Sequence, residues 1–110
     1  MNLEDLQSVC DKLENVTTDI KWGNDLCFCV GGKMFLVVNV DGKPVSASFK
    51  TDEETFNELV EREGFIPAPY LARHKWVYVD DIRRLSKKDW QHFINRSYEM
   101  VKAKLPKRKQ

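Results

Sequence analysis

Apolar residues recur at helical spacing near the start of the chain. Acidic residues mostly fall between them, so this segment predicts an amphipathic helix that buries one face. The apolar stripe consists of Leu3, Leu6, Val9, Cys10, Leu13 and Val16.

Two further helices are predicted in the second half of the chain. Thr51-Asp52-Glu53-Glu54 has the form of a capping box with Thr51 as the N-cap, and Gly64 fits a left-handed helix stop. Ser86 is predicted to cap the last helix, and the apolar stripe that follows predicts a buried Trp90. That stripe consists of Trp90, Phe93, Ile94, Ser97, Tyr98, Val101 and Leu105.

β-Branched and alternating residues predict strands between these helices. About four strands are expected at 17–22, 26–30, 33–40 and 45–49, and one more at 75–79. Gly31-Gly32 predicts a hairpin turn, because both glycines can take positive φ. The predicted fold is α+β: one two-layer domain over residues 1–110, with helices on one face of an antiparallel sheet, in the order α-β-β-β-β-α-β-α.

The predicted strand at 26–30 carries two of the three cysteines. Period-two alternation places Leu26, Phe28 and Val30 on one face and Cys27 and Cys29 on the other. An odd cysteine count, in a chain that begins without an export signal, predicts free thiols and a cytoplasmic location. The longest apolar run, at 35–38, is too short for a membrane span.

The stretch "PAPYLARHKWVYVDD", residues 67–81, combines stiffness with positive charge. Its two prolines predict an extended connection after the second helix, with Tyr70 and Trp76 packing at its ends. Arg73, His74 and Lys75 then form a predicted basic tip that leads into the last strand. We expect such a tip either to contact phosphates, as a wing entering a groove, or only to lead the chain into the strand.

Charge is divided unevenly along the chain, although the net charge is +1. Residues 1–64 hold six Lys/Arg against thirteen Asp/Glu, a formal charge of −7, and residues 65–110 have a formal charge of +8. This asymmetry suggests an anionic partner for the second part. The alternative is that the two parts attract each other and have no polyanionic partner.

A cluster of cations precedes and enters the last predicted helix. Arg83 and Arg84 stand before Ser86, and Lys87 and Lys88 fall in the first helical turn, where a cation is unfavourable by about 0.3–1 kcal/mol. With the free amides of the helix start, these four cations predict a cradle for phosphate. The alternative is a solvated helix end.

Catalytic and metal motifs are absent from the sequence. It contains no P-loop, nucleophile elbow, Ser/His/Asp pattern or dinucleotide-binding glycine pattern, so we expect no enzyme activity and no cofactor. Cys27 and Cys29 lack the further ligands of a closed metal site, and we predict no metal ligands. The acids Glu4, Asp11 and Glu14 leave frataxin-like iron binding open as an alternative, because they can share one helix side.

Three stretches of the chain together resemble one known family. "IKWGNDLCFCVGGKMF", "GFIPAPYLARHKWVYV" and "SYEMVKAKLPK" are similar, in order and spacing, to the MmcQ/YjbR family of small bacterial proteins. The resemblance implies a compact domain with a frataxin-like or secretion-chaperone-like fold, in a family often labelled DNA-binding and without catalytic residues. The positions that match its recurrent motifs are Trp22, Gly32, Lys33, Phe35, Pro67, Ala68, Tyr70, Trp76, Ser97 and Tyr98.

These observations predict a non-enzymatic binding module, a monomer or weak dimer with no membrane contact. The leading partner is DNA or another polyanion, bound through a basic surface in the second part of the chain. That surface comprises Arg73, His74, Lys75, Arg83, Arg84, Lys87 and Lys88. The alternatives are a protein partner on the exposed sheet face, as in a chaperone, and frataxin-like metal binding.

Overall fold

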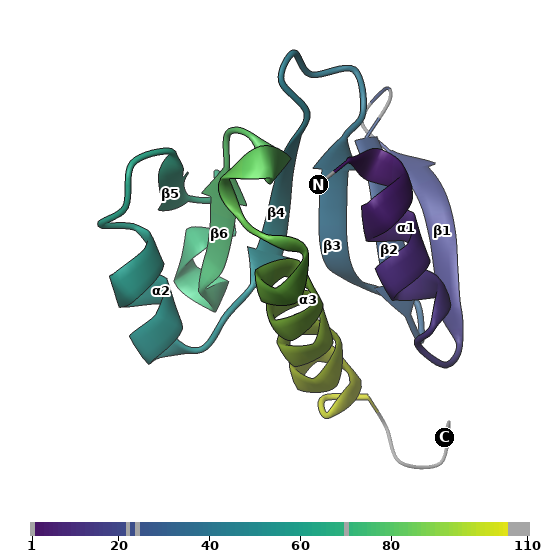
Figure 1. Cartoon of the computed structure of the whole chain (residues 1–110). Helices are drawn as coiled ribbons and strands as arrows, with labels where there is room; N and C mark the ends of the chain where they lie inside the picture. Colours follow the sequence, from purple (N-terminus) through teal and green to yellow (C-terminus); the bar gives the residue numbers. More distant parts are fainter. Residues whose placement is uncertain (1, 22, 24, 70, 106–110) are drawn as a thin grey trace.

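Six antiparallel strands form the sheet, in the order β1-β2-β3-β4-β6-β5 (Figure 1). The structure is a computed structural model that describes residues 2–21, 23, 25–69 and 71–105. The strands are β1 (Val16–Lys21), β2 (Asp25–Val30), β3 (Lys33–Asn39), β4 (Ser46–Lys50), β5 (Phe65–Pro67) and β6 (Trp76–Val79). The predicted antiparallel α+β fold is confirmed.

Three α-helices lie on one face of this sheet, as predicted (Figure 1). They are α1 (Leu3–Asp11), α2 (Glu53–Leu59) and α3 (Lys87–Lys102). Two short 3-10 helices flank β6: η1 (Ala72–His74) precedes it and η2 (Ile82–Arg84) follows it. We call the sheet face opposite the helices the open face. No helix in the described ranges is long and apolar enough to cross a membrane.

The core forms where alternating side chains of neighbouring strands meet α3. Phe28 lies opposite Leu36, Leu36 opposite Phe49, and Phe49 opposite Val77, so one row of apolar side chains crosses the sheet. Trp90, also fully buried, packs edge-on against Phe49 with ring centroids 5.4 Å apart. The sequence prediction that Trp90 is buried is confirmed.

The two faces of β2 also follow the predicted alternation. Phe28 and Val30 belong to the helix-side core, and Leu26 packs against it. Cys27 and Cys29 are buried outside that core, and both are free thiols. Together with buried Cys10, they confirm the prediction of unbridged cysteines.

Hydrogen bonds from three side chains hold α3 in place. The indole Nε1 of Trp90 donates to the Ile82 carbonyl at 2.7 Å. The buried Ser97 hydroxyl donates to the Phe35 carbonyl at 2.6 Å and accepts from the Lys50 amide at 3.1 Å, so it joins α3 to β3 and β4. The Tyr98 hydroxyl donates to the Glu14 carbonyl at 2.6 Å.

The predicted cap of α2 is wrong by one residue. Asp52 is the N-cap, and its carboxylate accepts from the Thr55 amide at 2.7 Å. The Thr51 hydroxyl instead donates to the Lys75 carbonyl at 2.8 Å. The helix ends at Leu59, so Gly64 lies in the turn before β5 rather than at the helix end. At α3 the predicted cap is correct, because the Ser86 hydroxyl accepts from the Asp89 amide at 3.1 Å.

The strand β5 was not predicted. Phe65–Pro67 pairs antiparallel with β6, with Pro67 opposite Val77. β5 is an edge strand, which is where a sheet tolerates proline. Beyond it the chain crosses toward the open face, where Ala68 and Trp76 are buried, and the Ala68 amide donates to the Trp76 carbonyl at 3.0 Å. The predicted packing of Trp76 is confirmed, and Tyr70 lies outside the described residues.

Candidate anion-binding site

The seven predicted contact residues fall into two groups at opposite ends of β6. Arg73, His74 and Lys75 lie in and after η1, just before Trp76. Arg83, Arg84, Lys87 and Lys88 lie in η2 and the first turn of α3, beyond Val79. Figure 1 shows these two ends of the strand separated by its length. The seven residues therefore do not make one local cluster.

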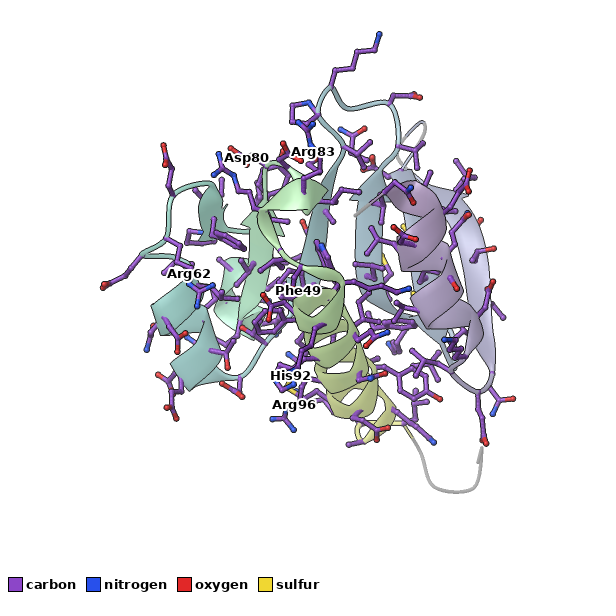
Figure 2. All side chains as sticks on the ribbon, viewed as in Figure 1. Phe49, Arg62, Asp80, Arg83, His92 and Arg96 are labelled. Atoms are coloured by element: carbon purple, nitrogen blue, oxygen red, sulfur yellow. The ribbon has the colours of Figure 1, made fainter. Side chains whose placement is uncertain are left out.

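The arginines at the η2 end are engaged by aspartates of the same segment. Arg83 binds Asp81 through two nitrogens, with Nη2 to Oδ2 at 2.9 Å and Nε to Oδ1 at 3.0 Å. Arg84 pairs with Asp80, with Nη2 to Oδ2 at 3.4 Å. Asp80 and Arg83 are labelled at this end of the sheet in Figure 2. We call Asp80, Asp81, Arg83 and Arg84 the paired cluster.

The paired cluster is internally neutral. Hydrogen bonds from the Arg83 side chain and amide lower the pKa of Asp81 from 3.8 to about 2, so its carboxylate is charged at neutral pH. The formal charges of two arginines and two aspartates cancel. The two arginines of the predicted cradle therefore already have partners in the protein, and phosphate binding by the four cations stays a prediction.

Arg84 also has a structural role at the turn before β5. Its guanidinium occupies the space that a Cβ at Gly64 would fill. Gly64 has a φ of +88°, and its carbonyl accepts from the Asp80 amide at 2.9 Å. Lys87 and Lys88 remain exposed in the first turn of α3, beside Asp89, and neither forms an ion pair with any described residue.

The basic tip at the other end of β6 is folded onto its neighbours. The Lys75 carbonyl accepts from both the amide and the hydroxyl of Thr51, each at 2.8 Å. The Lys75 ammonium lies over the Phe56 ring, 5.2 Å from its centroid. A tip held in this way lies against the domain surface, and its contact with a groove as a wing stays a prediction.

His74 nevertheless lines a cavity together with three lysines that come from separate segments of the chain. A cavity of about 430 Å³ lies where β3 and β6 begin and where β4 and α3 end. Its lining residues are Lys33, Met34, Lys50, His74, Trp76, Val101, Lys104 and Leu105. We call it the lysine cavity. None of these lining residues is acidic, in contrast to the paired cluster.

Lys50 is the most constrained cation of the lysine cavity. Its ammonium donates to the His74 carbonyl at 2.8 Å. Burial and the nearby positive charge of Lys104 both lower the pKa of Lys50 below its usual 10.5. The fold thus holds two like charges close together without a carboxylate between them, and a bound anion would offset their repulsion.

Other basic residues near the end of α3 already have partners. The Arg96 guanidinium donates to the Asp52 carboxylate at 3.3 Å, and the Lys102 ammonium lies 5.6 Å from the centroid of the Tyr98 ring. Figure 2 labels Arg96 near the same end of the helix. The basic residues Lys107, Arg108 and Lys109 lie outside the described residues.

Sequence reasoning missed Lys33, Lys50 and Lys104 because they are far apart along the chain. A weak signal was present, since Lys33 opens one predicted strand and Lys50 follows the end of the next. In consecutive antiparallel strands, the start of one strand and the end of the next lie at the same end of the sheet. The contribution of Lys104 depends on where α3 ends over the sheet, which local pattern does not specify.

A second hollow adjoins the lysine cavity on the open face. Its volume is about 450 Å³, and it shares Met34 with the lysine cavity. The residues that line it are mostly apolar: Asp25, Met34, Val37, Ser48, Ala68, Pro69 and Leu71. We call it the open-face groove. A larger hollow of about 600 Å³ lies near the paired cluster, and its charged lining includes Asp81 and Arg83, which bind each other.

The thiols and acids do not assemble into a metal centre within the described part of the chain. Burial raises the pKa of Cys10 to about 12 and that of Cys27 to about 11, so these thiols stay protonated at neutral pH. No three His, Cys, Asp or Glu side chains of the described residues converge on a common point. The acids at the start of the chain therefore gain no support as an iron site.

Comparisons with known proteins agree with this fold. A family model described as YjbR matches residues 11–100, which is most of the chain. The chain belongs to the YjbR family. This confirms the resemblance drawn from the sequence motifs. The comparison with curated proteins gave no match.

Two solved structures are similar to this YjbR-family chain. A Deinococcus radiodurans protein with a DUF419 domain has a TM-score of 0.87 and 25% sequence identity, covering 97% of this chain and 83% of its own. A Pseudomonas syringae protein has a TM-score of 0.73 at 17% identity, covering 92% of this chain and 99% of its own. The second likeness shows the fold alone. The family membership assigns no functional role to any residue of the lysine cavity.

Proposed function

We propose that this YjbR-family protein is a non-enzymatic binding module for a polyanion, with nucleic acid as the partner. The proposed contact surface is the lysine cavity together with the exposed side chain of Arg73 in η1. The observation that supports it is the convergence of Lys33, Lys50, Lys104 and His74 around a cavity with no acid among its described lining residues.

The electrostatics of Lys50 favour an anionic ligand over a neutral one. Its ammonium is partly buried beside another lysine, an arrangement that disfavours the charged form. A phosphate between the two lysines would replace repulsion with attraction on both sides. Phosphodiester oxygens suit such a site, because lysine ammonium groups are point donors that bind them without strict geometry.

The proposed partner is the polyanion predicted from the sequence, but the proposed contact surface differs from the predicted one. Arg73 and His74 remain in it, while Lys75 contributes mainly by holding the loop against Thr51 and Phe56. Arg83 and Arg84 are left out, because their aspartates would have to be displaced first. Lys87 and Lys88 lie at the other end of β6 and serve as the matched comparison.

The test measures binding to a labelled DNA oligonucleotide by fluorescence anisotropy at several salt concentrations. Three phosphate contacts predict a slope of log K against log salt of about −3 on duplex DNA and about −2 on a single strand. The double variant Lys33→Gln/Lys104→Gln should lower affinity and make the slope shallower by about 2. The control Lys87→Gln/Lys88→Gln removes the same formal charge and should leave both quantities close to those of the wild type.

Two results would contradict the proposal. If the control loses binding and the cavity variant retains it, the anion binds at the start of α3, as first predicted. If the wild type shows no salt-dependent binding even at low ionic strength, a polyanion is not the partner. The alternative of a protein partner on the open face would then lead, since apolar docking should depend little on salt and the open-face groove is mostly apolar.

A further inference from the structure

The geometry points to an unpaired nucleotide as the group that enters the lysine cavity, with its base against the apolar lining and its phosphate on the lysines. This inference rests on the proposed function and specifies the form of nucleic acid. It assigns the protein to single-stranded regions rather than to the duplex.

The lining of the lysine cavity is divided by chemistry. Met34, Trp76, Val101 and Leu105 supply apolar surface, whereas Lys33, Lys50, Lys104 and His74 supply polar and positive groups. Polyanion binding by charge alone requires no apolar lining. A nucleotide has the matching division, because its base presents an apolar π face and its phosphate presents charged oxygens.

The size of the cavity separates an unpaired base from a duplex. Its volume of about 430 Å³ lies within the range of about 300–1,000 Å³ typical of sites that enclose a small ligand. A duplex cannot enter such a space, and its bases keep their faces stacked inside the helix. Only a base that has left the stack can lay its face against protein side chains.

Met34 is the central apolar contact of this site. It is half-buried near the start of β3 and lines both the lysine cavity and the open-face groove. A thioether packs favourably against aromatic rings. Trp76 also lines the cavity, but it is only 5% exposed, so it offers a ligand a small part of its surface. The shared Met34 allows two neighbouring bases of one strand to lie on its two sides.

A nucleotide within a strand fits this arrangement better than a free nucleotide. The open-face groove shares Met34 with the lysine cavity and offers a second mostly apolar hollow, and its one charged lining residue is Asp25. Lys33, Lys50 and Lys104 provide more positive charge than one phosphodiester needs. Successive phosphates of a strand would use these cations while the following base occupies the groove.

The experiment compares four ligands on the full-length wild-type chain: a single-stranded oligonucleotide of about ten residues, an abasic strand of equal length, a duplex of the same sequence and a mononucleotide. Anisotropy measures affinity for the three labelled nucleic acids. Tryptophan emission that changes in the wild type and not in Trp76→Phe measures base contact, because Trp76 lines the cavity, Trp90 is fully buried and Trp22 lies outside the described residues. We expect the single strand to bind about tenfold or more tightly than the abasic strand and the duplex, and to quench emission. The mononucleotide should quench only at much higher concentration.

Two variants separate base contact from phosphate contact. Met34→Gln keeps the side-chain length and should weaken single-strand binding about fivefold or more, with the abasic strand unaffected. Met100→Gln is the control, since Met100 is half-buried on α3 and does not line the lysine cavity. Trp76→Phe should abolish the emission change while anisotropy still reports binding.

Each unfavourable outcome has a distinct meaning. Equal affinity for the abasic and natural strands overturns the base contact and leaves the polyanion proposal standing. Tighter binding of the duplex also overturns it. Binding of the mononucleotide with no gain from the strand overturns the continuation into the open-face groove. Failure of every nucleic acid to bind overturns the proposed function itself.

Discussion

Basic residues lie at both ends of β6, and the two ends differ in whether those residues have acidic partners. At the η2 end, Arg83 and Arg84 each bind an aspartate that stands two or four residues earlier in the chain. At the η1 end, Lys50 and Lys104 line one cavity, and none of its described lining residues is acidic. At the η2 end both arginines are thus paired with neighbours in the chain, whereas at the η1 end lysines from separate segments line one cavity.

This difference shows why charge counted along a sequence is an unreliable guide to a charged surface. The four cations at 83–88 are obvious in the sequence, yet Asp80 and Asp81 are equally close in the chain and bind two of them. The lysine cavity collects Lys33, Lys50 and Lys104 from three segments. Asp52 stands two residues after Lys50 in the chain and binds Arg96 instead. Whether a cation is bound to an acidic side chain, rather than how many cations a segment contains, determines whether it is available to a ligand.

The largest expected effect concerns what holds the η2 end together. Trp90→Ala should lower the free energy of unfolding by about 3–5 kcal/mol, because a large buried ring and its hydrogen bond to the Ile82 carbonyl are lost. Arg83→Ala should leave the denaturant midpoint nearly unchanged, since its ion pair is solvent-exposed. Urea unfolding followed by circular dichroism measures both. Equal losses would show that ion pairs, rather than the core, hold this end.

Two serines of α3 provide the next comparison. Ser97→Ala should cost about 1–3 kcal/mol, because the Lys50 amide and the Phe35 carbonyl lose their shared partner. It should also weaken polyanion binding, since it loosens the backbone that carries Lys50. Ser86→Ala should cost about 1 kcal/mol through loss of the N-cap and leave binding intact. Parallel unfolding and anisotropy measurements would contradict this if Ser86→Ala impaired binding more.

Charge at the two ends of α3 gives a smaller effect of opposite sign. Lys87→Glu should raise stability by about 0.3–1 kcal/mol, because an acid suits the positive end of the helix dipole. Lys102→Glu should lower it by a similar amount, since it reverses a favourable charge in the last turn. Chemical denaturation at low ionic strength checks both. Changes of the same sign would show that local contacts outweigh the dipole.

The smallest expected effects appear in the pH dependence of stability. The pKa of Asp81 is lowered from 3.8 to about 2, so its contribution is present above pH 3.8 and is lost as the pH falls toward 2. Asp81→Asn should remove this acid component. The pKa of Lys50 is lowered from 10.5, so the free energy of unfolding should increase as the pH rises toward 10.5. Lys50→Met should remove this increase. Difference unfolding curves between wild type and each variant measure these components, and identical curves would contradict the assigned causes.

Features of the fold with a local cause could be predicted from the sequence. The cap and apolar stripe of α3, the Gly31-Gly32 hairpin and the two faces of β2 follow from periodicity and turn chemistry within short windows. The N-cap of α2 was misplaced because Thr51 and Asp52 are both good capping residues, and the contact of Thr51 with Lys75 decides between them. β5 was missed because three residues ending in proline give no periodic signal.

The candidate site was harder to predict than the fold for a physical reason. Two of its members, His74 and Arg73, were identified because they stand together in a basic tripeptide. Lys33, Lys50 and Lys104 come together only when strand register, sheet order and the length of α3 are all known. The apolar lining of the site could not be predicted from the sequence either, since Met34 and Leu105 cannot be distinguished there from ordinary core residues.

Leu105, one wall of the lysine cavity, lies against Gly31 in the turn between β2 and β3. Its Cδ1 would be 2.5 Å from a Cβ added at Gly31, so any side chain there would push Leu105 aside. Leu105 ends a one-turn extension of α3, where its amide donates to the Lys102 carbonyl at 3.0 Å. The position of Leu105 in the cavity lining thus depends on a hairpin turn whose glycine contributes no side chain. Gly31→Ala would therefore displace Leu105 and change the shape of the lysine cavity without removing any of its lysines.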